Sequence, residues 1–152
     1  MTVRNRKDVR AEIYNGLLTA VSGAGKPASS VYTGQKKELN KESPVVLVLG
    51  SGIQREIAGV GSAKYDNSVN LEIWYLVYNG NESNPLTESQ REDALDDVEA
   101  ACAQWFVDHQ KGTTYRALDY TPQKTEIMPV KYIDGNPYLI ETALLVLDGR
   151  DA

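Results

Sequence analysis

The sequence predicts an α+β fold in which two helices pack on one face of a single mixed, mostly antiparallel sheet. Residues 5–21 and 87–110 carry apolar side chains at helical spacing, whereas residues 44–50 and 69–78 have the patterns of strands. A β-hairpin near the end of the chain adds antiparallel pairing. With 152 residues, 41% of them apolar, the chain is sized for a single hydrophobic core. We therefore expect one domain over residues 1–152.

The first helix is predicted over residues 5–21. Asn5 provides the N-cap, and Gly23 and Gly25 end the helix before Pro27. We expect one apolar face to pack on the sheet. That face repeats every four residues and comprises Val9, Ile13, Leu17 and Val21, supported by Leu18 and Ala20.

A long polar loop is predicted over residues 22–43. The segment is rich in Ser, Gly and Lys, and within it only Val31 and Tyr32 could form a short strand. Because its apolar content is low, we expect its lysine-rich part to be mobile in the isolated chain and ordered by contact with neighbours. That part carries Lys36, Lys37 and Lys41.

Three strands are predicted before the second helix. Residues 45–49 are continuously apolar and follow Pro44, which is typical of a central strand buried on both faces. Residues 53–60 form a weaker strand. Over residues 69–78, Val, Leu, Ile, Tyr and Val occupy every second position, and Asn, Glu, Trp, Leu and Tyr lie between them. This period of two predicts a strand that ends at Asn79.

The second helix is predicted to begin with a capping box formed by Thr87 and Gln90, and to end at His109 or Lys111, before Gly112. Its apolar stripe comprises Ala94, Leu95, Val98, Ala101, Cys102, Trp105 and Phe106. Its outer face is acidic, with much of the charge near the N-terminal end, where the helix dipole favours it. The acidic residues are Glu88, Glu92, Asp93, Asp96, Asp97 and Glu99.

A hairpin is predicted near the end of the chain. Residues 125–133 and 138–147 are its strands, and residues 134–137, with the sequence Asp-Gly-Asn-Pro, are the turn between them. Pro129 has no N–H to donate to a sheet, so it indicates an edge strand or a bulge.

Charge is unevenly distributed along the chain. The net charge is −5 and the pI is about 4.9, which argues against a nucleic-acid-binding protein. Residues 1–64 hold ten Lys or Arg against five Asp or Glu, whereas residues 65–152 hold six against sixteen. The asymmetry indicates either ordinary solvated surface or a particle with a basic and an acidic face, suited to meeting its own copies or other charged proteins.

The sequence predicts no membrane association. No apolar run approaches the roughly 20 residues that a helix needs to cross a bilayer. Residues 1–10 are charged and lack the apolar segment of a signal peptide. We expect a protein that is synthesised in a cytosol and stays soluble there.

Side chains that often carry chemistry are few. Cys102 falls on an apolar helix stripe and is expected to be a buried structural thiol, and a cationic His109 would complement the dipole at a helix C-terminus. Residues 23–26 and 50–52 resemble glycine-rich nucleotide loops but lack the remaining motif residues and the helix N-terminus that a phosphate needs. We expect no enzymatic activity, no cofactor and no metal site.

Tyrosine is the dominant aromatic residue, with nine Tyr against one Phe. It combines an apolar ring with a polar tip, which suits surfaces that are wet in the free subunit and covered on assembly. We expect Tyr14 and Tyr75 to lie in the core. Candidates for subunit contacts are Tyr32, Tyr65, Tyr115, Tyr120 and Tyr132.

The order of these elements resembles that of the tail terminator proteins of long-tailed bacteriophages, the lambda minor tail protein U type. The resemblance covers roughly residues 8–148 and is one of element order and pattern, without a diagnostic motif. It lies in the early helix with Arg10, Ile13 and Leu17, the apolar strand at 43–49, the alternating strand at 70–77, the acidic helix from Thr87 and the closing strand at 138–147. The longer loop at 22–43 and the segment 112–124 depart from the compact pattern of the family.

The resemblance implies a sheet with two helices on one face that assembles as a hexameric ring on the end of a tail tube. Such proteins stop polymerisation of the tube and provide the surface to which the filled head attaches, and they have no catalytic residues. The implied location is the head-proximal end of the virion tail. The implied partners are further copies of the chain, the tail tube protein and the head-tail connector protein.

The charge asymmetry adds an expectation about how copies meet. If the basic half of one copy faces the acidic half of the next, the contact is head-to-tail and closes into a ring. Candidate subunit or tube contacts are Lys36, Lys37, Lys41, Arg55, Tyr32, Tyr65, Tyr120 and Tyr132. Two alternatives stay open: a neighbouring head completion or neck connector protein, and a small cellular α/β ligand-binding domain.

Overall fold

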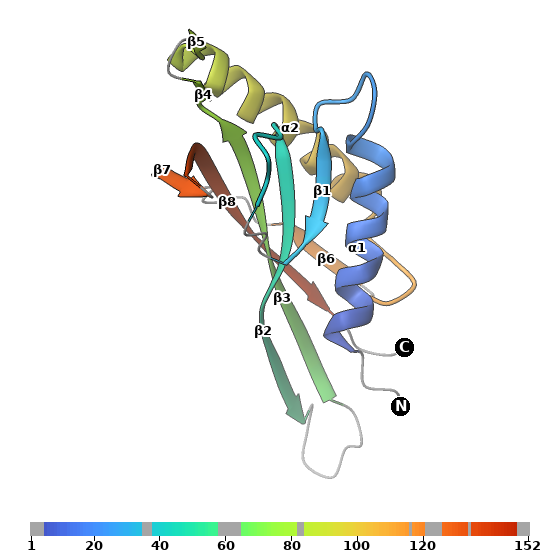
Figure 1. The fold of residues 1–152 in the computed structure, drawn as a ribbon. Helices are drawn as coiled ribbons and strands as arrows, with labels where there is room; N and C mark the ends of the chain where they lie inside the picture. The colour runs from blue at the N-terminus through green and yellow to red at the C-terminus, as the bar shows by residue number, and fades with distance from the viewer. Residues whose placement is uncertain are drawn as a thin grey trace.

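The computed structural model describes residues 5–34, 38–57, 65–81, 84–115, 117–120, 126–133 and 135–148. Two helices lie on one side of a mixed, curled sheet, as Figure 1 shows, and this confirms the predicted fold class. The helices are α1 (Arg6–Val21) and α2 (Glu88–Asp108). The strands are β1 (Ser30–Thr33), β2 (Val45–Ile57), β3 (Tyr65–Tyr78), β4 (Gly80–Asn81), β5 (Asn84–Pro85), β6 (Ala117–Tyr120), β7 (Glu126–Ile133) and β8 (Asn136–Asp148).

The main sheet has the strand order β1-β2-β3-β8-β6, and β7 also pairs with β8. Only the pairing of β1 with β2 is parallel; the other ladders of this sheet are antiparallel. β4 and β5 form a separate two-stranded ladder beside the start of α2.

The first helix is α1, and it begins where its cap predicts. The Asn5 side chain accepts a hydrogen bond from the Lys7 backbone N–H at 2.8 Å. The predicted apolar face of Val9, Ile13, Leu17 and Val21 is buried. The expected support from Leu18 and Ala20 is wrong, because both side chains are exposed. They lie outside the stripe that faces the sheet, since each residue turns the helix by about 100°.

The second helix is α2, and it begins at the predicted capping box. The Thr87 hydroxyl accepts from the Gln90 N–H at 3.1 Å, and the Gln90 side chain accepts from the Thr87 N–H at 2.9 Å. The helix ends at Asp108 with His109 as its C-cap, close to the predicted end. The residues buried along its stripe are Leu95, Val98, Cys102, Trp105 and Phe106.

β2 is one strand where the sequence predicts two. It continues through Gly50, Ser51 and Gly52 to Ile57, and the register with β3 shifts between the two glycines. A bulge keeps the pairing with β3 intact on both sides, so the glycines bend the strand without ending it. The predicted strand at 53–60 is therefore the outer part of β2 as far as Ile57, and residues 58–60 lie outside the described ranges.

The expected long loop at 22–43 contains a strand. β1 pairs in parallel with the start of β2, and Val31 is buried between the sheet and the helices. The turn before it is fixed by the Ala28 N–H, which donates to Val21 O at 2.9 Å, and by the Ser29 N–H, which donates to Pro44 O at 2.8 Å. Tertiary pairing with an apolar strand thus orders a segment whose own composition predicts a loop.

The terminal hairpin is confirmed. β7 and β8 pair up to Ile133 and Asn136, and Gly135 in the turn has a φ of 75°. The register shifts between Met128 and Lys131, which confirms the bulge that Pro129 predicts on an edge strand. β6 was not predicted; its four residues pair with the end of β8.

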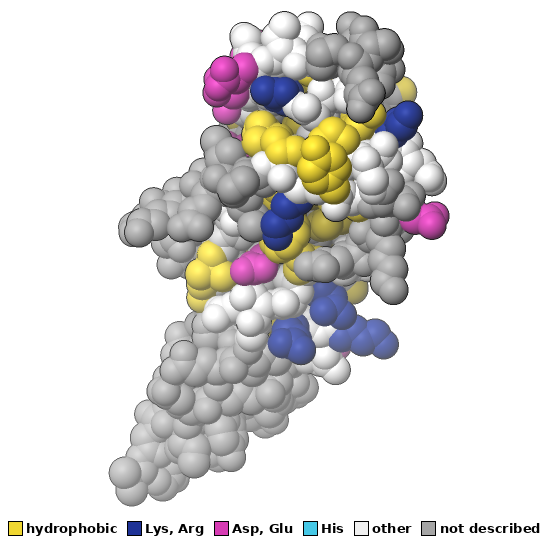
Figure 2. Space-filling model, turned by 60° about the vertical axis from the view of Figure 1, so that its left-hand side comes forward, with side chains coloured by type: hydrophobic (Ala, Val, Ile, Leu, Met, Phe, Trp, Pro, Cys, Tyr) yellow, Lys and Arg dark blue, Asp and Glu magenta, His cyan; other side chains and the backbone are white. Residues whose placement is uncertain are grey.

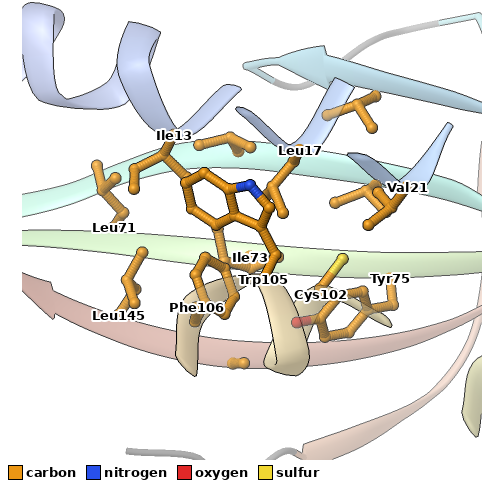
Figure 3. Packing of buried hydrophobic residues seen from close by; sticks show 14 of the residues in the cluster. Ile13, Leu17, Val21, Leu71, Ile73, Tyr75, Cys102, Trp105, Phe106 and Leu145 are labelled. Atoms are coloured by element: carbon orange, nitrogen blue, oxygen red, sulfur yellow. The ribbon is translucent and has the colours of Figure 1, made fainter. Parts of the chain in front are cut away.

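The main core lies between the helices and the sheet. Figure 3 shows Trp105 from α2 between Ile13 and Leu17 of α1 on one side and Ile73 of β3 on the other. Gly16 makes this close crossing possible, because a β-carbon at that position would overlap the Trp105 ring. Trp105 is buried, as its place on the apolar stripe predicts, and residues 45–49 are buried, as expected of a strand covered on both faces.

Candidate functional site

The side of the sheet that faces away from the helices, called here the second face, carries an apolar cluster of its own. Leu47 belongs to this cluster and not to the core beneath the helices. No described helix covers the second face. The buried members are Leu39, Val45, Leu47, Leu49, Leu76, Tyr138 and Ile140.

A strap formed by residues 38–44 covers part of the second face. Its Leu39 is buried in the cluster, and its Glu42 carboxylate accepts hydrogen bonds from the Tyr32 hydroxyl at 2.8 Å to each oxygen. The Tyr138 hydroxyl donates to Glu42 O at 3.0 Å, and the Tyr78 N–H donates to the Ser43 hydroxyl at 2.9 Å. These contacts hold the strap on the sheet.

Apolar surface remains exposed beyond the strap. Leu144 on β8 is 41% exposed, and Trp74 on the neighbouring β3 is half-buried with the Lys131 ammonium 5.8 Å from its ring centre. Tyr132, on the edge strand β7, is 74% exposed. Figure 2 shows apolar side chains gathered along this side of the molecule, between Lys, Arg, Asp and Glu. Such an exposed apolar surface with a polar rim is typical of a protein interface.

A second feature is the arm, defined as residues 54–57 of β2 with residues 65–68 of β3. Within the described ranges, the two strands pair to Ile57 and Tyr65, whereas β8 accompanies β3 as far as Ser68 and β1 accompanies β2 as far as Val48. Figure 1 shows the paired strands projecting past the ends of α1 and β8. Along its outer edge, the described part of β2 therefore has no strand partner beyond Val48.

The structure brings two of the predicted contact residues together. Arg55 pairs with Asn67 and Tyr65 pairs with Ile57, so both lie on the arm. Tyr120 lies on β6, but the side chains of Arg55, Tyr65 and Tyr120 are outside the described part of the protein, as are Lys36 and Lys37.

Two further candidates lie on the sheet edges, and a third lies in the strap. Lys41 is exposed in the strap and Tyr132 is exposed on β7, so both are free for contact in the described surface. Tyr32 on β1 is half-buried and already bonded to Glu42, so its hydroxyl fixes the strap. The sequence could not predict this bond, because it joins residues ten positions apart that meet only once β1 pairs in parallel with β2.

Tyr115 is not a surface residue, and the expectation of a subunit contact there is wrong. Its side chain is buried, and its hydroxyl donates to His109 O at 2.7 Å, which satisfies a carbonyl at the end of α2. Burial, with a smaller effect of the Glu12 charge, raises the pKa of Tyr115 to about 12. Tyr75 is buried as predicted, and Tyr14 packs against the same core.

The residues considered for chemistry have structural contacts. Cys102 is fully buried, and this burial, with a smaller effect of Glu99, raises the pKa of its thiol to about 12. His109 stacks on Trp105 at 4.2 Å between ring centres, and its Nδ1 lies 2.8 Å from Trp105 O. The Lys26 ammonium donates to Thr19 O. Within the described ranges, no group of three or more His, Cys, Asp or Glu is arranged to hold a metal ion.

Similarity to known proteins does not identify the chain. No protein-family model matches it, and a search of curated proteins found no match. Among the described residues, no helix is both long enough and apolar enough to span a membrane.

Proposed function

We propose that this chain is a structural virion subunit, the tail terminator of a long-tailed bacteriophage. In this proposal, copies form a ring that caps the tail tube, stops its polymerisation and provides the surface to which the head joins. The ring sits at the head-proximal end of the tail, and each subunit is made in the host cytoplasm. Its function rests on binding to copies of itself, to the tube protein and to the head-tail connector, without catalysis.

The observation that carries the proposal is the arm. A two-stranded hairpin is marginally stable in water without a further layer, and its free edges invite pairing with another chain. A partner chain that lies against the arm would cover these edges. The arm also holds Arg55 and Tyr65, two residues that the sequence predicts as contacts.

Two further observations support the same proposal. Leu144 and Trp74 leave apolar surface open on the second face, as expected for a subunit that buries this side on assembly. The fold also has the arrangement that the family resemblance implies, with both helices on one face of the sheet.

Native mass spectrometry across a salt series, with and without purified tail tubes, tests the proposal. We expect a ring that binds the ends of tubes and stops their growth. The ring should loosen near 1 M salt, where the screening length falls to about 3 Å. A salt-insensitive dimer that never binds a tube end would contradict the proposal. Binding to the head connector without binding to tube ends would assign the chain to the neck instead.

A further inference from the structure

The first turns of α1 carry a cationic surface, formed by Arg6, Lys7 and Arg10. A β-carbon on Gly50 would lie 3.2 Å from Arg10 Nη1 and 3.4 Å from Arg6 Nε, so both guanidinium groups lie over the bare backbone of this glycine. Positive charge at a helix N-terminus is opposed by the helix dipole. Residues 6–10 carry three cations against one carboxylate, Asp8, so this surface keeps a net positive charge.

The first turns of α2 carry the opposite charge. Five exposed carboxylates lie within ten residues: Glu88, Glu92, Asp93, Asp96 and Asp97. Several are four positions apart, a spacing at which like charges on a helix repel. Arg91 lies among them in the sequence, but its guanidinium is directed to Asn79 Oδ1 and Leu86 O. The helix dipole favours negative charge at this end, but the acidic face of α2 has no ion pair with Arg91, the cation that lies among these residues.

The two surfaces cannot neutralise each other within one molecule. Figure 1 shows the start of α1 low in the view, and the start of α2 at the top, next to β4 and β5. In the view of Figure 2, a group of Lys and Arg side chains lies on the lower part of the described surface, and further Lys, Arg, Asp and Glu side chains are interspersed above it. A second copy, however, can place its acidic end against the cationic end of the first.

We propose that the cationic surface of Arg6, Lys7 and Arg10 docks on the acidic face of α2 of a second copy. The inference rests on the proposed function in one respect, namely that the chain assembles with itself. Because the two surfaces are different and lie at opposite ends, the contact is heterologous and repeats from copy to copy. A protein partner is favoured over nucleic acid, because the net charge of −5 repels phosphates.

A charge-swap experiment tests the contact. One variant carries Arg6→Glu with Arg10→Glu, and the other carries Glu92→Lys with Asp96→Lys; all four side chains lie outside the core. We expect each variant alone to lose self-association by about tenfold or more in sedimentation velocity, because like charges then face each other. An equimolar mixture should restore association through alternating subunits.

The matched control carries Lys26→Glu with Lys111→Glu. It changes the net charge by the same amount as the first variant, but at exposed sites that follow the C-terminal ends of the two helices. We expect it to associate as the wild type does. Circular dichroism confirms that each variant is folded. Equal effects of the control and the first variant, or a mixture that fails to associate, would overturn the inference.

Zero-length cross-linking with a carbodiimide gives a second measurement on the wild-type chain. In a mixture of ¹⁴N- and ¹⁵N-labelled protein, we expect amide cross-links between Lys7 of one copy and the α2 carboxylates of another. Their absence would overturn the inference. So would binding to duplex DNA that depends on Arg6 and Arg10 without such cross-links, because it would assign the surface to phosphates.

The outcomes separate this inference from the proposed function. Rings that bind tube ends but ignore the charge reversals would remove the inference and leave the proposed function standing. Complementary variants that associate with each other, in assemblies that never bind a tube, would support the inference and contradict the proposed function.

Discussion

The Glu12 carboxylate joins α1 to the segment that follows α2. It accepts hydrogen bonds from the backbone N–H and the hydroxyl of both Thr113 and Thr114, at distances from 2.5 to 2.9 Å. Partial burial acts to raise the pKa of Glu12, but these hydrogen bonds together outweigh it and lower the pKa below its ordinary value. The ionised form is thus the one that the fold stabilises.

Glu12→Gln should destabilise the protein in a pH-dependent way. We expect a loss of about 1 to 3 kcal/mol in the free energy of unfolding at pH 7, because hydrogen bonds to a charged acceptor are lost. A carboxyl group with a lowered folded-state pKa contributes stability above its unfolded pKa of about 4.3, and loses this contribution as the pH falls through the folded value. The difference between wild type and variant should therefore shrink below about pH 4.

Urea denaturation at several pH values measures this effect. The exposed Glu38→Gln serves as the control and should change stability by less than about 0.5 kcal/mol. A Glu12→Gln loss that stays constant from pH 7 to pH 3 would show that the carboxylate acts by packing and not by its charge.

Cys102 should resist thiol reagents in the folded protein. Its side chain is fully buried, and with a pKa of about 12 almost no thiolate exists at pH 8. We expect alkylation by iodoacetamide, followed by mass spectrometry, to proceed only through unfolding and to accelerate with denaturant. In a Val107→Cys variant, the new thiol on the exposed side of the same helix should react rapidly. Equal rates at the two positions would contradict the burial of Cys102.

At the scale of elements, the crossing of α1 and α2 depends on a small residue facing a large one. The Trp105 ring occupies the space where a Gly16 side chain would lie, and it forms an edge contact with Phe106 at 5.6 Å between ring centres. The helices can pack this closely only while Gly16 has no side chain.

Gly16→Ala should destabilise the protein although alanine favours helix. Overpacking of a core costs about 1 to 3 kcal/mol, and this should exceed the gain of up to about 1 kcal/mol in helix propensity. The exposed Asn15→Ala on the same helix is the control and should be neutral or slightly stabilising. Thermal and urea unfolding measure both variants. A Gly16→Ala protein as stable as Asn15→Ala would show that the crossing tolerates a side chain.

Trp105→Ala tests the same crossing from the other helix. Removing the ring should cost about 3 to 5 kcal/mol, because the site cannot fully close the cavity. A measured loss below about 1 kcal/mol would mean that the ring contributes little to the core.

At the scale of the whole molecule, removing the arm tests assembly independently of folding. The core beneath the helices includes Val69 and Leu71 of β3, which lie at the base of the arm. Replacing residues 54–68 by Asn-Gly would close the strands directly beyond the pair of Ile53 and Val69 with a favoured hairpin turn. The shortened chain should keep the fold and lose the contacts that the arm makes.

We expect this shortened chain to unfold within about 1 kcal/mol of the wild type, yet to fail to form rings and to bind tube ends. Native mass spectrometry and tube-binding assays measure the loss, and a chain that keeps the arm but carries Glu38→Gln is the control. A shortened chain that assembles normally would remove the arm from the proposed interface.

The sequence by itself determined the local elements with regular patterns. The apolar periodicity of α1 and α2, the capping box at Thr87 and the alternation in β3 each depend on neighbours within a few residues, so they could be predicted. The turn at Gly135 and the bulge after Met128 follow from the same local rules.

Only the tertiary structure decided what distant segments do to one another. β1 and β6 have weak local signals and become strands because β2 and β8 offer free edges for them. The joining of two predicted strands into β2, the bond of Tyr32 to Glu42 and the burial of Tyr115 likewise depend on contacts across the fold. The arm and the two charged ends belong to this class too, because a surface exists only once the chain has been arranged in space.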